Sequence, residues 1–240
     1  MAQGVEVGVQ GLGPSPTLFL RLFGELSGDG VRAVYALAPY LGERGGGVSL
    51  ERLYVRVEEG EWSLVLGRFP LTLGEGRLFP YTWNTPGPAG GEEGVWGGAL
   101  TWYGSWRLRL GYAWERGGFL EAAWSEGRLW LEEQGMGVAG SVRLGEVVAY
   151  GEGRLWAGRP FGLLGASLAL GDGVVTVEGA FPWAGAVGLS WPLEGASLAG
   201  SLGYGPGWWG WVGLEGEEYW VRLGRLGGVW AWGFGVRGEF

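Results

Sequence analysis

The stretch VWAWGFGVRGEF, residues 229–240, decides the fold because its two alternating sets of residues differ in chemistry. The large apolar side chains share one parity: Trp230, Trp232, Phe234, Val236 and Phe240. The other parity holds alanine, two glycines, Arg237 and Glu239. A β-strand places alternate residues on opposite faces. The stretch is therefore predicted to be a strand with one aromatic face and one small or charged face.

The same period-two alternation recurs along the chain. It is clear in PTLFLRLFGE, residues 16–25, and in WRLRLGYAW, residues 106–114. Turn signals rich in glycine and acidic residues separate these segments at intervals of about ten to thirteen residues, the length of a tilted membrane-spanning strand plus a tight turn. No segment shows helical periodicity, and no linker divides the chain. We expect a single all-β domain over residues 1–240.

Composition narrows the range of functions. The chain has 54 glycines, which argues against a helical protein because glycine weakens helix interiors. It has neither cysteine nor histidine, which excludes disulfides, thiolate chemistry and any imidazole base. We predict no enzyme activity, no cofactor and no metal site. The net charge of -8 argues against nucleic acid as a partner.

Two architectures fit many amphipathic antiparallel strands: a soluble sandwich or barrel with its apolar face inside, and a membrane barrel with that face toward lipid. Only 18% of residues are charged, which is low for a soluble exterior. Acidic residues gather in the turns, for example Glu58, Glu59, Glu217 and Glu218, and tryptophans flank the turns. Aromatic residues at both water interfaces are typical of a membrane barrel. We therefore predict a transmembrane antiparallel β-barrel.

The terminal GFGVRGEF resembles the C-terminal β-signal of bacterial outer-membrane β-barrel proteins. Phe234, Val236 and Phe240 match its alternating hydrophobic positions, whereas Gly238 stands where many members have a bulkier residue. The resemblance implies recognition by the barrel-assembly machinery and closure of the last strand onto the first. Closure and lipid together would cover a strand that ends the chain with an apolar face.

A second stretch, LGRFPLTLGEGRLFP at residues 66–80, is similar to a strand-and-loop segment of some substrate-specific porins. These resemblances imply a porin-like protein in the bacterial outer membrane, with membrane lipid as its surroundings. The start MAQGVEV predicts a mature N-terminus at Ala2 behind an initiator methionine, with the signal peptide already removed. Further partners left open are a second copy of the chain and a surface layer.

Turn counting predicts an even number of about 16 strands, within a range of about 12 to 18. The higher count treats the short pair around Glu126 as two strands, and the lower count merges it with a neighbour. The fifth strand is expected over about Glu61 to Leu73. A long segment rich in glycine and proline, residues 74–94, follows it. We expect this segment to be a surface loop, with an inward constriction as the alternative.

The face opposite the apolar one should line the lumen, and it carries the candidate selectivity residues: Arg21, Arg52, Arg56, Arg107, Arg109 and Arg222. No acidic residue separates Arg52 from Arg56, or Arg107 from Arg109, on the lumen face of its strand. Fixed positive charge in a channel raises the local concentration of anions. The sequence therefore predicts a passive channel for small solutes that favours anions. The alternative is a structural or anchoring barrel whose lumen is filled by paired arginines and glutamates.

Overall fold

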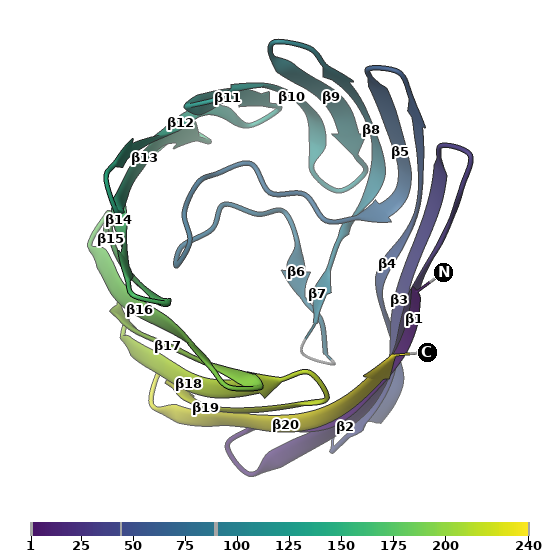
Figure 1. Ribbon diagram of the computed structural model, residues 1–240, viewed down its shortest axis with the longest axis vertical. Helices are drawn as coiled ribbons and strands as arrows, with labels where there is room; N and C mark the ends of the chain where they lie inside the picture. The colour runs from purple at the N-terminus through teal and green to yellow at the C-terminus, as the bar shows by residue number, and fades with distance from the viewer. Residues whose placement is uncertain (1, 44, 89–90, 240) are drawn as a thin grey trace.

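The alternating segments form 18 antiparallel strands that close into one barrel (Figure 1). The computed structural model describes residues 2–43, 45–88 and 91–239. The first barrel strands are β1 (Ala2–Leu12), β2 (Ser15–Gly28), β3 (Val31–Gly42), β4 (Gly45–Glu59), β5 (Trp62–Phe69), β8 (Val95–Tyr103), β9 (Arg107–Ala113), β10 (Gly117–Trp124) and β11 (Gly127–Glu132). The remaining ones are β12 (Gly135–Leu144), β13 (Val147–Trp156), β14 (Arg159–Leu170), β15 (Gly173–Phe181), β16 (Ala184–Leu193), β17 (Ala196–Tyr204), β18 (Trp208–Gly216), β19 (Tyr219–Leu226) and β20 (Val229–Glu239).

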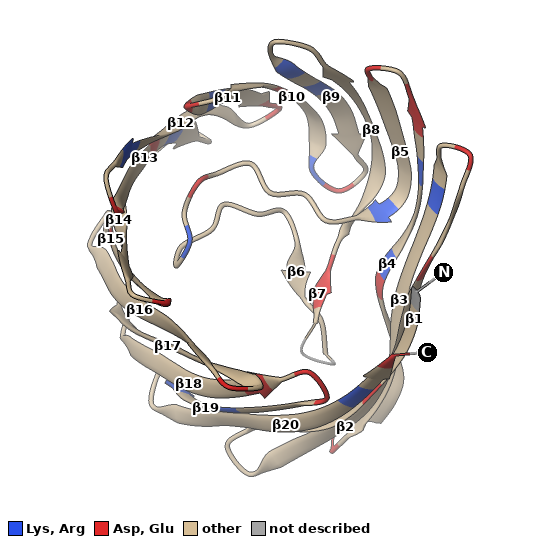
Figure 2. Ribbon diagram, in the orientation of Figure 1, with Lys and Arg blue, Asp and Glu red and all other residues tan. Residues whose placement is uncertain are grey.

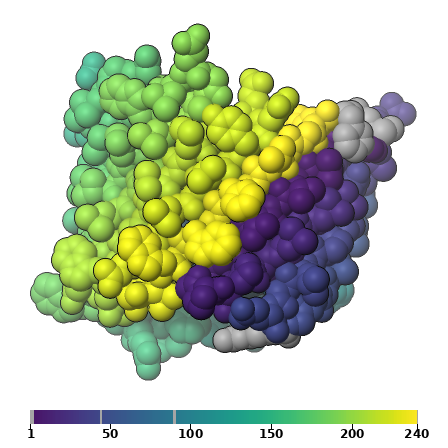
Figure 3. Space-filling model, turned by 90° about the horizontal axis from the view of Figure 1, so that it is seen from below, coloured from purple at the N-terminus to yellow at the C-terminus, as the bar shows by residue number. Residues whose placement is uncertain are grey.

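The barrel closes where the last strand pairs with the first. β1 and β20 are antiparallel, with a register that runs from Gly4 opposite Glu239 to Leu12 opposite Ala231. Figure 3 shows β20 lying directly along β1. The predicted even number is confirmed, and 18 lies at the upper end of the expected range. The count exceeds 16 because β10 and β11, on either side of Glu126, are separate strands that pair with each other.

The apolar face points outward, as the membrane-barrel prediction requires. In β2, Leu18, Leu20 and Leu22 are exposed, whereas Phe19 between them is buried in the interior. The same division holds on β9, where Leu108 and Leu110 are exposed. A continuous apolar exterior around a closed barrel is the surface that a lipid bilayer solvates. None of the described residues forms a helix long and apolar enough to cross a membrane.

Both chain ends lie at the same edge of the barrel, which we call the terminal rim, and the opposite edge is the loop rim. Most connections at both rims are two or three residues long. The turn between β2 and β3 is one of the tightest. Asp29 and Gly30 there have φ angles of 47° and 76°. Two successive residues with positive φ are typical of the hairpin turn that matches strand twist.

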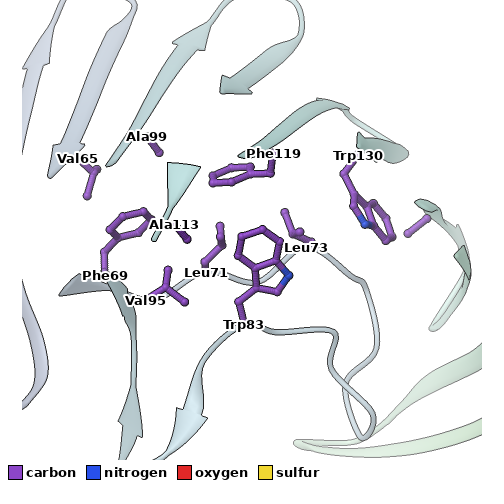
Figure 4. Packing of buried hydrophobic residues seen from close by; sticks show 11 residues of the cluster. Val65, Phe69, Leu71, Leu73, Trp83, Val95, Ala99, Ala113, Phe119 and Trp130 are labelled. Carbon is purple, nitrogen blue, oxygen red and sulfur yellow. The ribbon is translucent and has the colours of Figure 1, made fainter. Parts of the chain in front are cut away.

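The connection between β5 and β8, residues 70–94, folds into the lumen (Figure 1). It contains a short hairpin of β6 (Thr85–Pro86) and β7 (Glu92–Glu93). Leu71, Leu73 and Trp83 of this inward loop are buried against the inner faces of β5 and β8 to β12. Trp83 meets Phe119 of β10 edge to face, with ring centroids 5.7 Å apart. Figure 4 shows these side chains packed together.

The expectation of a surface loop over residues 74–94 is therefore wrong, and the predicted fifth strand is too long. β5 ends at Phe69 rather than near Leu73. The alternation of Leu71, Thr72 and Leu73 resembles a strand, but its leucines cover the inner wall instead of facing outward. Leaving such apolar side chains in water costs free energy, and burial inside the wide barrel avoids that cost.

Candidate functional site

One buried carboxylate holds the inward loop against the far wall of the barrel. Glu178 of β15 accepts hydrogen bonds from three successive backbone N–H groups, residues 77–79, at 2.5, 3.0 and 2.9 Å. The Tyr150 hydroxyl donates to the same carboxylate at 2.6 Å. A Cβ at Gly76 would overlap the carbonyl oxygen of Phe79, so the tight turn that aligns these N–H groups requires glycine. Glu178 is 2% exposed, and its hydrogen bonds replace the solvation it loses.

Side chains from β11, β13 and β14 add further anchors to the same limb of the loop. Glu152 accepts the backbone N–H of Glu75 at 3.0 Å. The Glu75 carboxylate in turn pairs with Arg128 at 2.5 Å. The Arg77 guanidinium donates to Ser167 at 2.7 Å. This limb is therefore fixed by charge-assisted hydrogen bonds in addition to apolar packing.

Tyr81 fixes the loop near the loop rim. Its hydroxyl donates to Glu132 of β11 at 2.5 Å. The guanidinium carbon of Arg154 lies 4.0 Å from the centre of the Tyr81 ring and 3.8 Å from that of Phe161, within cation–π range. Burial raises the pKa of Tyr81 above its ordinary value, and the hydrogen bond to Glu132 raises it further. Tyr81 thus remains a neutral hydrogen-bond donor at physiological pH.

The returning limb of the loop is held near β1, β4 and β5. Arg68 pairs with Glu93 at 2.7 Å and donates to the Gly94 carbonyl at 2.9 Å. Ser49 donates to Glu93 at 2.7 Å. Gln10 of β1 donates to the Pro88 carbonyl at 3.1 Å. The inward loop thus crosses the lumen to β15 and comes back, which narrows the interior of the barrel.

A cavity of about 450 Å³ lies against the inner wall formed by β18, β19, β20, β1 and β2. Its charged lining residues are Glu6, Arg21, Glu215, Arg222 and Arg237. Trp211 and Trp220 also line it. We call this space the charged cavity.

Ion pairs fix the charged side chains of this cavity. Arg21 lies between Glu6 at 2.7 Å and Glu51 at 2.9 Å. Arg222 and Arg237 share the carboxylate of Glu215, at 3.4 and 2.9 Å. Arg222 also lies over the Trp220 ring at 5.5 Å. The charged side chains of this cavity are therefore held in fixed positions.

Solved structures similar to this chain are bacterial outer-membrane barrels. A mutant of the Rh. blastica porin matches with a TM-score of 0.55 and 12% identity, covering 100% of this chain and 99% of that chain. Pseudomonas aeruginosa OccK5 (OpdH) matches with a TM-score of 0.57 and 11% identity, covering 100% of this chain and 97% of that chain. The chain shares the closed antiparallel β-barrel fold of these porin structures. No protein-family model and no curated protein sequence match it.

Within this porin fold, the arginines predicted to form an acid-free wall are paired. Arg107 and Arg109 of β9 reach Glu121 of β10 at 3.3 and 2.7 Å, and Arg128 of β11 reaches the same carboxylate at 3.4 Å. Glu121 is fully buried. The acid comes from the neighbouring strand, in direct register with Arg109, and not from the arginines' own strand. The sequence pattern along one strand could not reveal it.

The remaining predicted arginines have different surroundings. Arg56 lies 3.6 Å from Glu58 at the terminal rim. Arg52 stands at a β-bulge where the register between β3 and β4 shifts at Ala36 and Leu37. It is exposed and makes no ion pair or hydrogen bond with the residues that the structure describes. Arg21 and Arg222 line the charged cavity.

The predicted assembly signal lies on the exterior of the porin fold. Phe234 and Val236 are exposed on the outward face of β20, at 52% and 61%. Phe240 lies outside the described residues. Recognition of these residues by the assembly machinery stays a prediction.

The sequence interpretation missed the residues that anchor the loop. Glu152 and Glu178 are single acidic residues in the middle of otherwise apolar or glycine-rich strands, within AYGEGRL and VVTVEGA. A charge at the centre of a predicted membrane strand is costly unless it is paired inside the barrel. That signal marks these glutamates as lumen anchors, although it does not identify their partners.

Proposed function

We propose that the chain is an outer-membrane channel through which small solutes diffuse passively. The charged cavity carries this proposal, because it lies on the side of the lumen that the inward loop does not fill. Its polar groups would replace part of a solute's hydration, and the loop would limit the size of what passes. The porin fold supports the outer-membrane location, and the proposal assigns no catalysis to the chain.

The anion preference is the finer part of the proposal. Arg21 of the charged cavity lies between two carboxylates, those of Glu6 and Glu51, whereas Arg222 and Arg237 share the single carboxylate of Glu215, which leaves one excess positive charge on that side of the cavity. Arg222 is more accessible to an anion than Arg237, because its side chain is 56% exposed. It also shares the carboxylate of Glu215 with Arg237. A single excess charge in a narrow channel favours anions weakly.

The test is conductance in a planar lipid bilayer, with the reversal potential measured under a salt gradient. Discrete conductance steps and a weakly anion-selective potential are expected. Arg222→Gln should move the potential toward cation selectivity. Arg225→Gln is the matched control, because Arg225 lies on the same strand with the opposite parity and has no ion pair among the described residues.

A filled structural barrel is the second candidate. The apolar cluster between the inward loop and the strands from β5 to β12 favours it, because this packing closes that side of the lumen. A chain that folds into a heat-resistant barrel but gives no conductance would support this candidate and refute the channel. An unchanged reversal potential in Arg222→Gln would refute only the anion assignment.

A further inference from the structure

The outer face of the barrel has a groove where large side chains are absent. The groove crosses β11 to β16 and has a volume of about 1100 Å³. Glycines of the lipid-facing parity form its floor: Gly127, Gly140, Gly151, Gly153, Gly162 and Gly179. Trp124 borders it near the terminal rim, and Phe181, Trp183 and Tyr204 border it near the loop rim. The groove therefore runs from one aromatic edge of the exterior to the other.

Nothing within the chain requires glycine at the centre of this groove. A Cβ added at Gly153 or at Gly179 would have no atom within 4 Å. Neither residue has a positive φ angle. Glycine in a strand interior weakens the strand, and it often marks a place where a ligand approaches the backbone closely. The open floor is thus explained by an occupant outside the chain.

The lining indicates hydrocarbon as that occupant. Apart from main-chain atoms and Glu126 at the terminal rim, the floor and walls are glycine, aliphatic and aromatic residues such as Val138 and Leu164. Glu152 does not make the groove polar, because its carboxylate lies on the lumen side of the wall, where it accepts a hydrogen bond from the inward loop. At about 30 Å³ for a group the size of a water molecule, the groove holds on the order of 35 such groups, which is comparable with the carbon atoms in the two acyl chains of one phospholipid.

The charge at the terminal rim indicates the headgroup. Every turn at this rim except residues 104–106 carries an acidic residue, as the red turns in Figure 2 illustrate, and these acids outnumber the arginine that reaches a turn there, Arg143, which donates to the Gly145 carbonyl. The acids are Asp29, Glu61, Glu126, Glu146, Asp172, Glu194, Glu217 and Glu218. Glu126 is itself part of the groove lining. A row of carboxylates attracts an ammonium group and repels lipids with a net negative headgroup.

We propose that this groove binds the acyl chains of one phospholipid, with an ammonium-bearing headgroup beside Glu126 at the terminal rim. The site requires a bilayer around the barrel, and it does not depend on whether the lumen conducts.

The test uses the full chain in nanodiscs with equal amounts of phosphatidylethanolamine and phosphatidylglycerol. After transfer to detergent, native mass spectrometry counts the lipids that each barrel retains. About one retained phosphatidylethanolamine per barrel is expected, because the groove volume fits about one phospholipid. Filling the groove with Gly153→Leu and Gly179→Leu together should remove it. Gly118→Leu is the matched control, because Gly118 has the lipid-facing parity on β10, lies outside the groove, and a Cβ there would meet only one atom, at 3.9 Å.

A separate substitution tests the contact between Glu126 and the lipid headgroup. Glu126→Gln should reduce the preference for phosphatidylethanolamine, whereas Glu194→Gln, at a distant turn of the same rim, should not. If the double leucine variant does not fold, lipid retention is compared between Gly179→Ala and the wild-type chain. Spin-labelled lipid bound to the wild-type chain then tests whether the lipid lies in the groove. Equal retention of phosphatidylglycerol, retention of lipopolysaccharide instead, or cross-linking of two barrels through Trp183 would each overturn the proposal. Retained lipid that is unaffected by filling the groove would also overturn it.

Discussion

Replacing the loop anchor Glu178 with glutamine should release the inward loop. The Oε1 atom accepts from the Arg77 N–H and the Tyr150 hydroxyl, and the Oε2 atom accepts from the two following N–H groups. A glutamine keeps one acceptor oxygen and presents an amide N–H₂ where the other stood. Two hydrogen bonds to a charged group are therefore lost, at about 1.5 kcal/mol or more each. A loss of about 3 kcal/mol raises the undocked fraction of the loop by about 100-fold.

Two assays measure the release of the inward loop. Single-channel recordings should show larger and noisier conductance, because an undocked loop no longer narrows the lumen. Trypsin should cleave after Arg77, the only arginine in residues 70–94, and expose a new N-terminus that reads LFPYT. Glu194→Gln is the control, because the side chain of this turn residue makes no hydrogen bond or ion pair with the described residues. If Glu178→Gln retains both the wild-type conductance and resistance at Arg77, the carboxylate is not what holds the loop.

Three further changes test other parts of the barrel. Glu121→Gln leaves Arg107, Arg109 and Arg128 without their shared carboxylate, so the barrel should lose about 3 kcal/mol or more and unfold at a lower temperature in a heat-modifiability gel; an unchanged transition would show that the cluster is not coupled. Tyr81→Phe should weaken loop docking by about 1 to 2 kcal/mol, measured by cleavage at Arg77. The pKa of Tyr81 is raised in the folded protein, so its contribution to loop docking is fully present below the ordinary pKa of 10.0 and is lost as the pH rises above that value. Cleavage of the wild-type chain at Arg77 should therefore increase in alkali. The phenylalanine variant should lack that increase. Gly8→Val places a side chain against the Phe19 ring and the Phe234 carbonyl oxygen at the seam, so the yield of heat-resistant barrel should fall; normal assembly would contradict the need for a close approach there.

The anchors and ion pairs join residues that are far apart in the sequence. Residue 77 and Glu178 are separated by 101 positions, yet the carboxylate accepts the backbone N–H at 2.5 Å. The alternation of residues along the strand predicts that Glu178 faces the lumen, but it does not predict which residues lie across the lumen from it. The same limit explains Glu121, since its arginines come from the strands on both sides of β10. An arginine pattern therefore overstates free positive charge when the neighbouring strands are unknown.

The sequence by itself determined the strands, their turns, the outward direction of the apolar face and closure at the end of the chain. The strands and turns follow from a two-residue period and from short turn sequences, which are local properties of the backbone. The outward direction of the apolar face follows from the low content of charged residues and from the aromatic residues beside the turns. Closure is implied by the resemblance of the last strand to the β-signal. Only the tertiary structure decided the place of residues 70–94. Leu71 and Leu73 alternate as they would in a strand, and their burial inside the barrel depends on an inner wall built from β5 and β8 to β12. The groove is decided in the same way, because glycines spread from Gly127 to Gly179 form one surface only when register aligns their strands.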